Sequence, residues 1–226
     1  MDLREKMLGR LRALSEEKLA KFSQRLIPAP QILGVRTPAL RALARKSFAV
    51  LGGMDEARRK LQNYKPVFHE EFVLKGFLIM LLKQDEAKFA LASDFIKTMP
   101  NWAVCDMFAP KFRDAAFVDA LLKQAKSGAD EFERRFFYVY FMRNMSAISP
   151  EEFFEICAAE SDERYYVQMG AAWAIAEMFI KQRESTLAFL ASKRAAKFVQ
   201  NKAISKIRDS FRVSKADKEA LLKYKI

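Results

Sequence analysis

The chain has 226 residues, and 51% of them are hydrophobic. This length and composition exclude a disordered chain and suit one or two domains or one repeat array. Gly and Pro number only seven each, whereas Phe alone contributes 20 residues, so helices with short loops and an aromatic core are favoured. The net charge is +12, from 40 Lys and Arg against 28 Asp and Glu. Such an excess usually serves binding to a polyanion, although a merely basic cytosolic protein is the alternative.

The cysteines, the histidine and the apolar runs exclude several other classes. Cys105 and Cys157 lie in apolar helical stretches, so we expect buried free thiols in a reducing compartment rather than a disulfide framework. With His69 as the only histidine and no paired Cys motif, we expect no metal site. The amino terminus, MDLREKMLGRLRAL, lacks the apolar region of a signal peptide, and the apolar run around Met169 to Ile175 is too short to span a bilayer. We therefore expect a cytoplasmic protein with no membrane partner.

In chain order, the sequence predicts a capping segment at residues 1–30 and then a series of helices. The first of these read PALRALARKSF from Pro38 and HEEFVLKGFLIMLLK from His69. The HEE triplet is not a zinc-binding HExxH motif. Glu70 and Glu71 instead fit the first turn of a helix, where acidic side chains face the positive end of the helix dipole.

The segment NWAVCDMFAPKF follows from Asn101 and contains the first candidate site residues. Trp102 and Asp106 stand four residues apart, just over one helical turn, so they project from the same face. Taken alone, such a Trp is usually a core residue, and an Asp near a helix start is usually a surface or capping residue.

The second half of the chain continues the series of helices. DEFERRFFYVYFM contains adjacent arginines, Arg134 and Arg135, which point about 100° apart on a helix. Ser149 is a good cap for the helix PEEFFEICAAE, with Pro150 at its first position. The helix ERYYVQMGAAWAIAEMF contains Trp173, and the last segment reads VQNKAISKIRDSF.

The starts of the long apolar segments recur at intervals of roughly 30 to 36 residues, which is in the range of helical repeat proteins. No segment shows sustained strand alternation, and no Asn-Gly or Asp-Gly hairpin signal occurs. The sequence therefore predicts an all-α fold. Antiparallel helix pairs would stack into a single repeat domain over residues 1–226, curved around a concave basic cleft.

From Lys197 to Lys215 the chain carries a run of cations interrupted only by Asp209. A charge run of this kind is often just a solvated helix face. The alternative, which the net charge favours, is phosphate contact at one end of the cleft. The cations expected to contact DNA in this way are Lys197, Lys202, Lys206, Arg208 and Arg212.

Several motifs together resemble the AlkD-like superfamily of DNA alkylation repair proteins, which are built from HEAT-like repeats. They are GVRTPALRALAR, HEEFVLKG, NWAVCDMFAPK, FERRF, YYVQMGAAWAIAE and NKAISKIRDSFRVS, and they extend over nearly the whole chain. In the glycosylases of that family, a Trp and an Asp on one helix, an Arg on the next repeat and a Trp on the one after line the DNA-binding cleft. Matching residue by residue places these roles on Trp102, Asp106, Arg135 and Trp173.

The resemblance implies a monomeric glycosylase that binds double-stranded DNA and excises N3- or N7-alkylated purines without flipping the base. An alkylated purine is already cationic and leaves without a general acid. Aromatic rings and a carboxylate would stabilise the positive charge that develops on the deoxyribose, and Asp106 could also position the attacking water. Arg135, with Arg134 beside it, would contact a phosphate. No cofactor is expected, since the chain has no P-loop and no dinucleotide glycine fingerprint.

Two positions depart from the glycosylase pattern. Where those enzymes tend to carry cations before and after the second Trp, this chain has Met169 and Ala176. This departure keeps open a non-catalytic DNA-binding protein for damaged or branched DNA. A third alternative is a helical repeat protein that binds an acidic protein. Asp106 and Trp173 on a shared concave face would favour the glycosylase.

Overall fold

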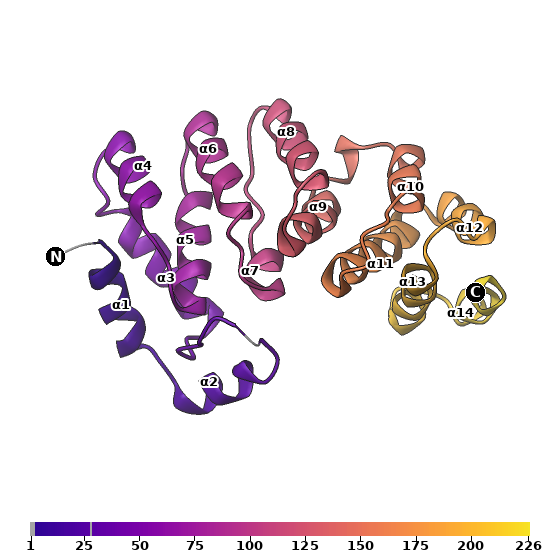
Figure 1. Cartoon of the computed structure of the whole chain (residues 1–226), viewed down its shortest axis with the longest axis horizontal. Helices are drawn as coiled ribbons and strands as arrows, with labels where there is room; N and C mark the ends of the chain where they lie inside the picture. The colour runs from indigo at the N-terminus through magenta and orange to yellow at the C-terminus, as the bar shows by residue number, and fades with distance from the viewer. Residues whose placement is uncertain (1–2, 28) are drawn as a thin grey trace. The chain divides into compact units, whose positions relative to one another are not determined.

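The computed structural model describes residues 3–27 and 29–226, and all regular secondary structure in these residues is helical (Figure 1). The predicted all-α fold class is confirmed. The chain divides into two compact units, Met1–Gln124 and Ala125–Ile226, which are described separately below. The prediction of a single domain stays a prediction. None of the helices in the described residues is long and apolar enough to cross a membrane.

In unit 1, alternate helices lie side by side in two rows (Figure 1). One row holds α3, α5 and α7, and α4 packs on α6 in the other. Helix α2 has no buried residue and stands apart from both rows. The helices of unit 1 are α1 (Leu3–Ala13), α2 (Glu17–Gln24), α3 (Thr37–Phe48), α4 (Met54–Asn63), α5 (His69–Met80), α6 (Asp85–Ile96), α7 (Trp102–Met107) and α8 (Ala115–Lys126), the last of which runs across the unit boundary.

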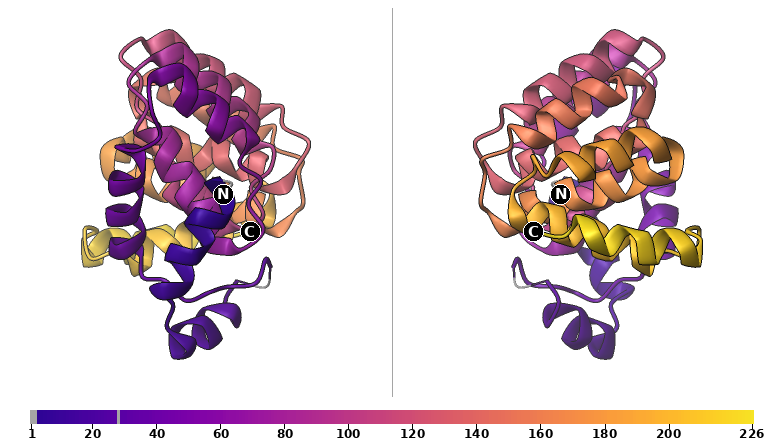
Figure 2. Two further views of the ribbon diagram at one scale, coloured as in Figure 1. Left: turned by 90° about the vertical axis from the view of Figure 1, so that its left-hand side faces the viewer. Right: turned by 90° about the vertical axis from the view of Figure 1, so that its right-hand side faces the viewer.

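Unit 2 repeats this arrangement. Helix α11 is the centre of its first row, packing on α9 on one side and on α13 on the other (Figures 1 and 2). Helix α12 packs on both α10 and α11. The helices of unit 2 are α9 (Glu131–Arg143), α10 (Pro150–Ala158), α11 (Tyr165–Lys181), α12 (Arg183–Ser192), α13 (Lys197–Asp209) and α14 (Lys215–Ala220), with 3₁₀ turns at Met145–Ala147 and Leu221–Tyr224.

The spacing of the first-row helices explains the sequence repeat. These helices begin about 30 to 35 residues apart, as the recurring apolar segments predicted. Within each unit, a repeat contributes one helix to each row, so that its apolar faces are covered by neighbouring repeats of that unit. The starting residues are Thr37, His69, Trp102, Glu131, Tyr165 and Lys197.

The cores of both units are rich in aromatic rings, as the Phe content predicted. In unit 2, Phe141 stacks on Phe153 with ring centroids 4.2 Å apart. In unit 1, Phe95 and Phe108 meet edge to face at 4.9 Å. Burying a Phe side chain stabilises a fold by about 1.5–3 kcal/mol. Cys105 and Cys157 are both buried and do not form a disulfide, as expected.

Candidate functional site

The short helix α7 carries the first two candidate residues, and its cap fixes where they stand. The side-chain oxygen of Asn101 accepts a hydrogen bond from the backbone N–H of Val104 at 3.0 Å, which makes Trp102 the first helical residue. Asp106 follows one turn later on the same face, and both side chains are half-buried. The helix is shorter than its sequence segment suggested, because Phe108 takes an extended backbone and packs into the core.

Trp102 is partly a packing residue and partly a surface residue. Its indole N–H donates to the carbonyl oxygen of Leu26 at 3.3 Å. Its ring packs against an apolar cluster formed by Ile27, Ile32 and Ala103. The ring is therefore held in one place by the segment that precedes α3, while part of it stays accessible.

The same preceding segment is tied to α7 through Asn101. The amide nitrogen of Asn101 donates to the carbonyl oxygen of Ala29 at 2.9 Å and lies 3.3 Å from Nδ1 of His69. The backbone N–H of His69 in turn donates to the carbonyl oxygen of Gln31 at 3.0 Å. Burial lowers the pKa of His69, against the opposing effect of the negative charge on Glu70. A neutral imidazole fits this position, because an unprotonated Nδ1 can accept from the amide.

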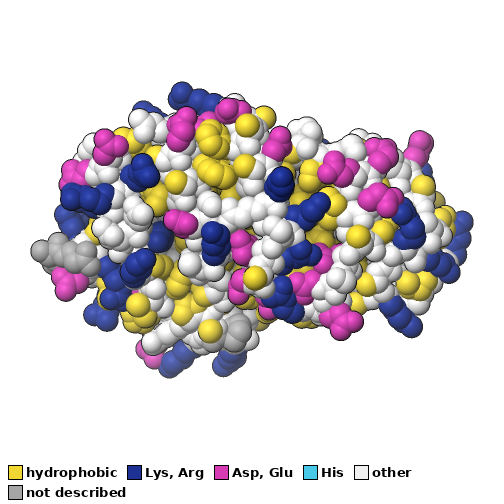
Figure 3. Space-filling model, turned by 45° about the horizontal axis from the view of Figure 1, so that its top comes forward, with side chains coloured by type: hydrophobic (Ala, Val, Ile, Leu, Met, Phe, Trp, Pro, Cys, Tyr) yellow, Lys and Arg dark blue, Asp and Glu magenta, His cyan; other side chains and the backbone are white. Residues whose placement is uncertain are grey.

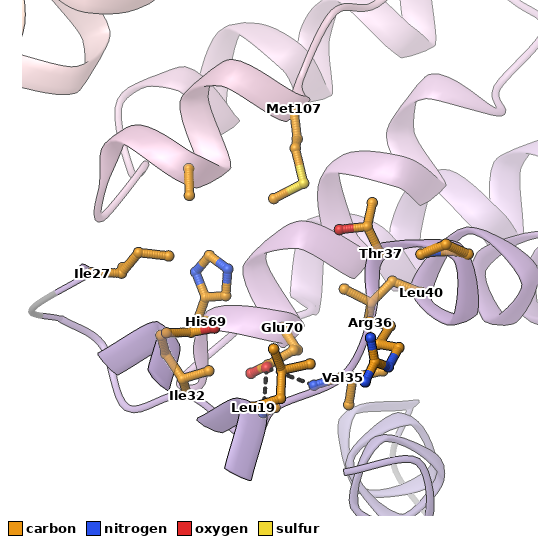
Figure 4. Close-up of a pocket in the computed structure, with 14 residues that line it drawn as sticks. Leu19, Ile27, Ile32, Val35, Arg36, Thr37, Leu40, His69, Glu70 and Met107 are labelled. Atoms are coloured by element: carbon orange, nitrogen blue, oxygen red, sulfur yellow. Dashed lines mark hydrogen bonds between the residues drawn. The ribbon is translucent and has the colours of Figure 1, made fainter. Parts of the chain in front are cut away.

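Glu70 holds the chain immediately before α3 (Figure 4). Its carboxylate accepts backbone hydrogen bonds from Leu33 at 2.8 Å, Gly34 at 2.7 Å and Val35 at 3.1 Å. Gly34 has φ +85°, and a Cβ there would lie 2.3 Å from the backbone oxygen of Glu16. Only glycine fits that position. The HEE motif is structural, as predicted, but its first carboxylate anchors a distant backbone segment rather than its own helix.

A pocket of about 440 Å³ borders α7 within unit 1 (Figure 4). Met107 and His69 point into it from different helices, and most of its lining is apolar. Helix α7 thus has an open side next to the turn that carries Asp106. The lining residues are Leu19, Ser23, Ile27, Ile32, Gly34, Val35, Arg36, Thr37, Pro38, Leu40, His69, Glu70, Ala103 and Met107.

Trp173 lies in unit 2, half-buried on α11, and lines a second pocket of about 320 Å³. The ammonium group of Lys206 on α13 stands 6.0 Å from the centre of its ring, at the outer limit of a cation–π contact. Arg212 donates to the carboxylate of Glu177 at 2.6 Å across the same pocket, and this bond raises the pKa of Arg212. The lining residues are Trp173, Ala176, Glu177, Lys206, Asp209, Ser210 and Arg212.

The paired arginines of α9 both have protein partners. Arg134 makes a two-pronged ion pair with Glu160 at 2.5 and 2.6 Å. Arg135 is only 6% exposed and donates to the carbonyl oxygen of Tyr166 at 3.0 Å. Arg134 thus joins α9 to the segment between α10 and α11, and Arg135 joins it to the first turn of α11, so each arginine has a structural role. Their assignment as DNA contacts stays a prediction.

The predicted basic run does not form one surface. Lys202 and Lys206 are one turn apart on α13, on the side of the Trp173 pocket. Arg208 points to the other side of the helix, where it donates to the carbonyl oxygen of Lys218 at 3.0 Å. Lys197 is exposed at the start of α13. The described structure therefore brings together Lys206 and Arg212 with Trp173, and separates Arg208 from them.

The two departures from the family pattern are also placed. Ala176 lines the Trp173 pocket and is 7% exposed, and Met169 is half-buried one turn before Trp173. Glu177, which the sequence analysis did not single out, places a carboxylate directly after Ala176, the position where the glycosylase pattern has a cation. Within residues 3–27 and 29–226, no three His, Cys, Asp or Glu side chains form a group that could hold a metal ion.

The sequence analysis missed the structural roles of two residues of the site, the capping role of Asn101 and the anchoring role of Glu70. Asn101 had a signal, since an Asn directly before an apolar helical segment is a favoured N-cap. Glu70 had none, because its backbone partners lie 35 to 37 residues away in the sequence.

A comparison with curated proteins found no match. The sequence profile of the family described as DNA alkylation repair enzyme matches residues 7–207, which include the candidate residues of both units except Arg208 and Arg212. The chain, with its repeating helices and its tryptophans on α7 and α11, therefore belongs to the DNA alkylation repair enzyme family.

Proposed function

We propose that the protein is a DNA glycosylase that hydrolyses the N-glycosidic bond of N3- and N7-alkylated purines in double-stranded DNA. Its family gives it a role in DNA repair. The observation that carries the finer proposal is the arrangement on α7. Trp102 and Asp106 share one face and are both accessible, and the Asn101 cap and the contacts of Trp102 fix their positions.

The proposed chemistry needs little beyond this pair. The alkylated purine already carries a positive charge, so it departs without protonation by the protein. As its bond to C1′ lengthens, positive charge develops on the deoxyribose. The face of Trp102 and the carboxylate of Asp106 stabilise that charge, and Asp106 orients the water that attacks C1′. The base need not enter a pocket, because the interactions are with the sugar.

Unit 2 has a separate set of proposed DNA contacts. Trp173 lies against a deoxyribose or backbone segment, with Lys206 and Arg212 near phosphates at the same pocket. Lys202 extends this cationic side of α13 by one turn. The proposal keeps Arg134, Arg135, Lys197 and Arg208 as further backbone contacts.

The test is base release from duplex DNA that carries a single N7-methylguanine or N3-methyladenine. We expect the wild-type protein to release the methylated base and Asp106→Asn to release it at least tenfold more slowly. Tenfold corresponds to about 1.4 kcal/mol of transition-state stabilisation, a modest demand on a charge facing a cationic sugar. DNA affinity and folding stability should change by less than about 0.5 kcal/mol, because the change is isosteric at an accessible position.

Asp119→Asn is the matched control, since Asp119 is an exposed carboxylate on α8 of the same unit. It should leave base release unchanged. Equal activity of Asp106→Asn and wild type would contradict the assignment of Asp106. A loss of folding stability in Asp106→Asn as large as its loss of activity would make Asp106 a structural residue.

A second candidate function is DNA binding without base excision. The environment of Trp173 favours it, because Ala176 and Met169 supply no cation there and Glu177 neutralises Arg212. In that case the wild-type protein binds duplex DNA but releases no base. Ala176→Arg should then strengthen binding without producing base release.

A further inference from the structure

Phe211 is the most exposed large apolar residue among those described, with its side chain fully in solvent at 104%. It occupies the turn between α13 and α14. The other exposed apolar residues of unit 2 are partly covered; Tyr165, for example, is 54% exposed and contacts the ring of Phe198. Single exposed apolar residues are common on protein surfaces. The surroundings of Phe211 set it apart from them.

The turn that carries Phe211 is fixed on both sides of the ring. The backbone N–H of Arg212 donates to the hydroxyl of Ser210 at 3.2 Å, and Val213 is buried at 8% exposure. Ser214 then caps α14, accepting from the backbone N–H of Asp217 at 3.1 Å. The ring is therefore held away from the protein by an ordered turn, and a contact made by it loses little backbone freedom.

Phe211 belongs to the turn that borders the Trp173 pocket, although its own side chain does not line it. Its two sequence neighbours, Ser210 and Arg212, both line that pocket, together with Trp173 and Lys206. Arg212 is exposed, and it also pairs with Glu177. The turn thus presents an exposed aromatic ring next in sequence to a cation of the pocket, Arg212, and exposed aromatic rings near cations bind nucleic acid by stacking on bases while the cations contact phosphates.

We propose that Phe211 stacks on the face of a nucleobase at an unstacked position in DNA bound by unit 2. The proposal rests on the DNA binding proposed above and adds a base contact to it. In an intact duplex, base faces are covered by their neighbours, and opening a step for an apolar wedge costs a few kcal/mol. An unpaired base removes most of that cost. Phe211 therefore makes the protein prefer DNA with a locally unstacked base over intact duplex.

The test compares the affinity for intact duplex DNA with that for the same duplex carrying one unpaired adenine. We expect wild type to prefer the second DNA and Phe211→Ala to lose that preference. Loss of one base–aromatic stack corresponds to a fall in affinity of about 5- to 150-fold. Affinity for the intact duplex should change less than about twofold, since the ring finds no exposed base face there. Phe211→Trp should keep the preference.

Three controls separate the possible failures. Leu222→Ala removes another exposed apolar side chain of unit 2, 44% exposed, and should change neither affinity. Lys202→Ala should weaken both DNAs equally, as a phosphate contact does. Sedimentation of wild type and Phe211→Ala checks whether the ring instead binds a second copy of the chain.

The outcomes are distinct. Equal weakening of both DNAs by Phe211→Ala, no effect on either, or a change in oligomeric state would each overturn the stacking assignment while leaving the proposed function standing. Binding of neither DNA by wild type would instead overturn the proposed function, and the stacking proposal with it. Because Phe211 has no burial to lose, its substitution should leave the melting temperature unchanged.

Discussion

His69 links protonation to the stability of the segment that holds Trp102. Burial lowers its pKa below the 6.5 of an exposed histidine. As the pH falls below about 6.5, the unfolded chain therefore takes up a proton before the folded one does, and the free energy of unfolding falls. The stabilisation is fully present above pH 6.5.

For His69 we predict that the free energy of unfolding depends more steeply on pH in wild type than in His69→Gln. Wild type should lose stability between pH 7.5 and 5.5 by more than His69→Gln, whose side chain does not titrate in this range. Urea unfolding of both proteins at several pH values measures the effect. Since the chain contains one histidine, a single imidazole resonance gives its pKa directly. Parallel stability curves, or a resonance that titrates at 6.5 or above, would contradict the prediction.

At the scale of secondary-structure elements, the N-cap of α7 both begins the helix and ties it to the segment that precedes α3. Asn101 is 2% exposed, caps α7, and donates to Ala29 as well as approaching His69. Asn101→Ala removes the cap, worth about 1 kcal/mol, and also leaves a carbonyl group without this partner, at about 1–3 kcal/mol. We expect a loss of about 2–4 kcal/mol in the free energy of unfolding, and a smaller rate of base release because Trp102 loses its fixed position.

Ser149→Ala is the control for this prediction. Ser149 is an exposed N-cap whose hydroxyl accepts from the backbone N–H of Glu152 at 3.1 Å. Its removal should cost only about 1 kcal/mol. If both variants lose the same stability, then Asn101 acts only as a cap and the link to the preceding segment is unimportant.

The helices could be predicted from the sequence because their information is local. The apolar spacing in α11 and the Ser149-Pro150 start of α10 are read within a few residues, and both predictions were confirmed. The parts that could not be predicted depend on distant partners. Glu70 bonds to backbone groups more than 30 residues away, and nothing near Arg134 in the sequence indicates its ion pair with Glu160.

The candidate site was predicted in part for the same reason. The shared face of Trp102 and Asp106 follows from their spacing alone. The sequence could not show that Trp102 also packs on Ile27 and Ile32, which come from a segment about 70 residues earlier. The two-residue spacing of Lys206 and Arg208 already puts them on opposite sides of a helix, but the sequence could not show that Arg208 donates to the carbonyl oxygen of Lys218.

At the scale of the whole molecule, positive charge exceeds negative charge, but the cations are not gathered on every surface. On the face shown in Figure 3, Lys and Arg side chains are interspersed with Asp, Glu and apolar side chains. On this face the excess of 40 Lys and Arg over 28 Asp and Glu therefore does not form one continuous basic patch. DNA affinity should depend on a limited number of phosphate contacts rather than on the total charge.

The corresponding prediction is a linear fall of log affinity for DNA with log salt concentration, with little dependence on DNA sequence. Each phosphate contact contributes about 0.9 to the slope. Lys202→Ala and Lys206→Ala should each reduce the slope by about that amount. Lys60→Ala is the control, since Lys60 pairs with Glu56 at 2.7 Å and is not a proposed DNA contact. Affinity that is independent of salt would refute the electrostatic contacts.

The chain contains two tryptophans, and each unit has one of them, in both cases half-buried at its proposed DNA contacts. Intrinsic fluorescence therefore reports on the two units separately once one ring is replaced by Phe. In Trp173→Phe, the emission comes from Trp102 and follows the environment of α7. In Trp102→Phe, it comes from Trp173 and follows the pocket beside Lys206. Titrating each variant with duplex DNA would show, without any attached dye, the DNA concentration at which each tryptophan is quenched. Comparing the two concentrations would tell whether the two units bind DNA together or one before the other.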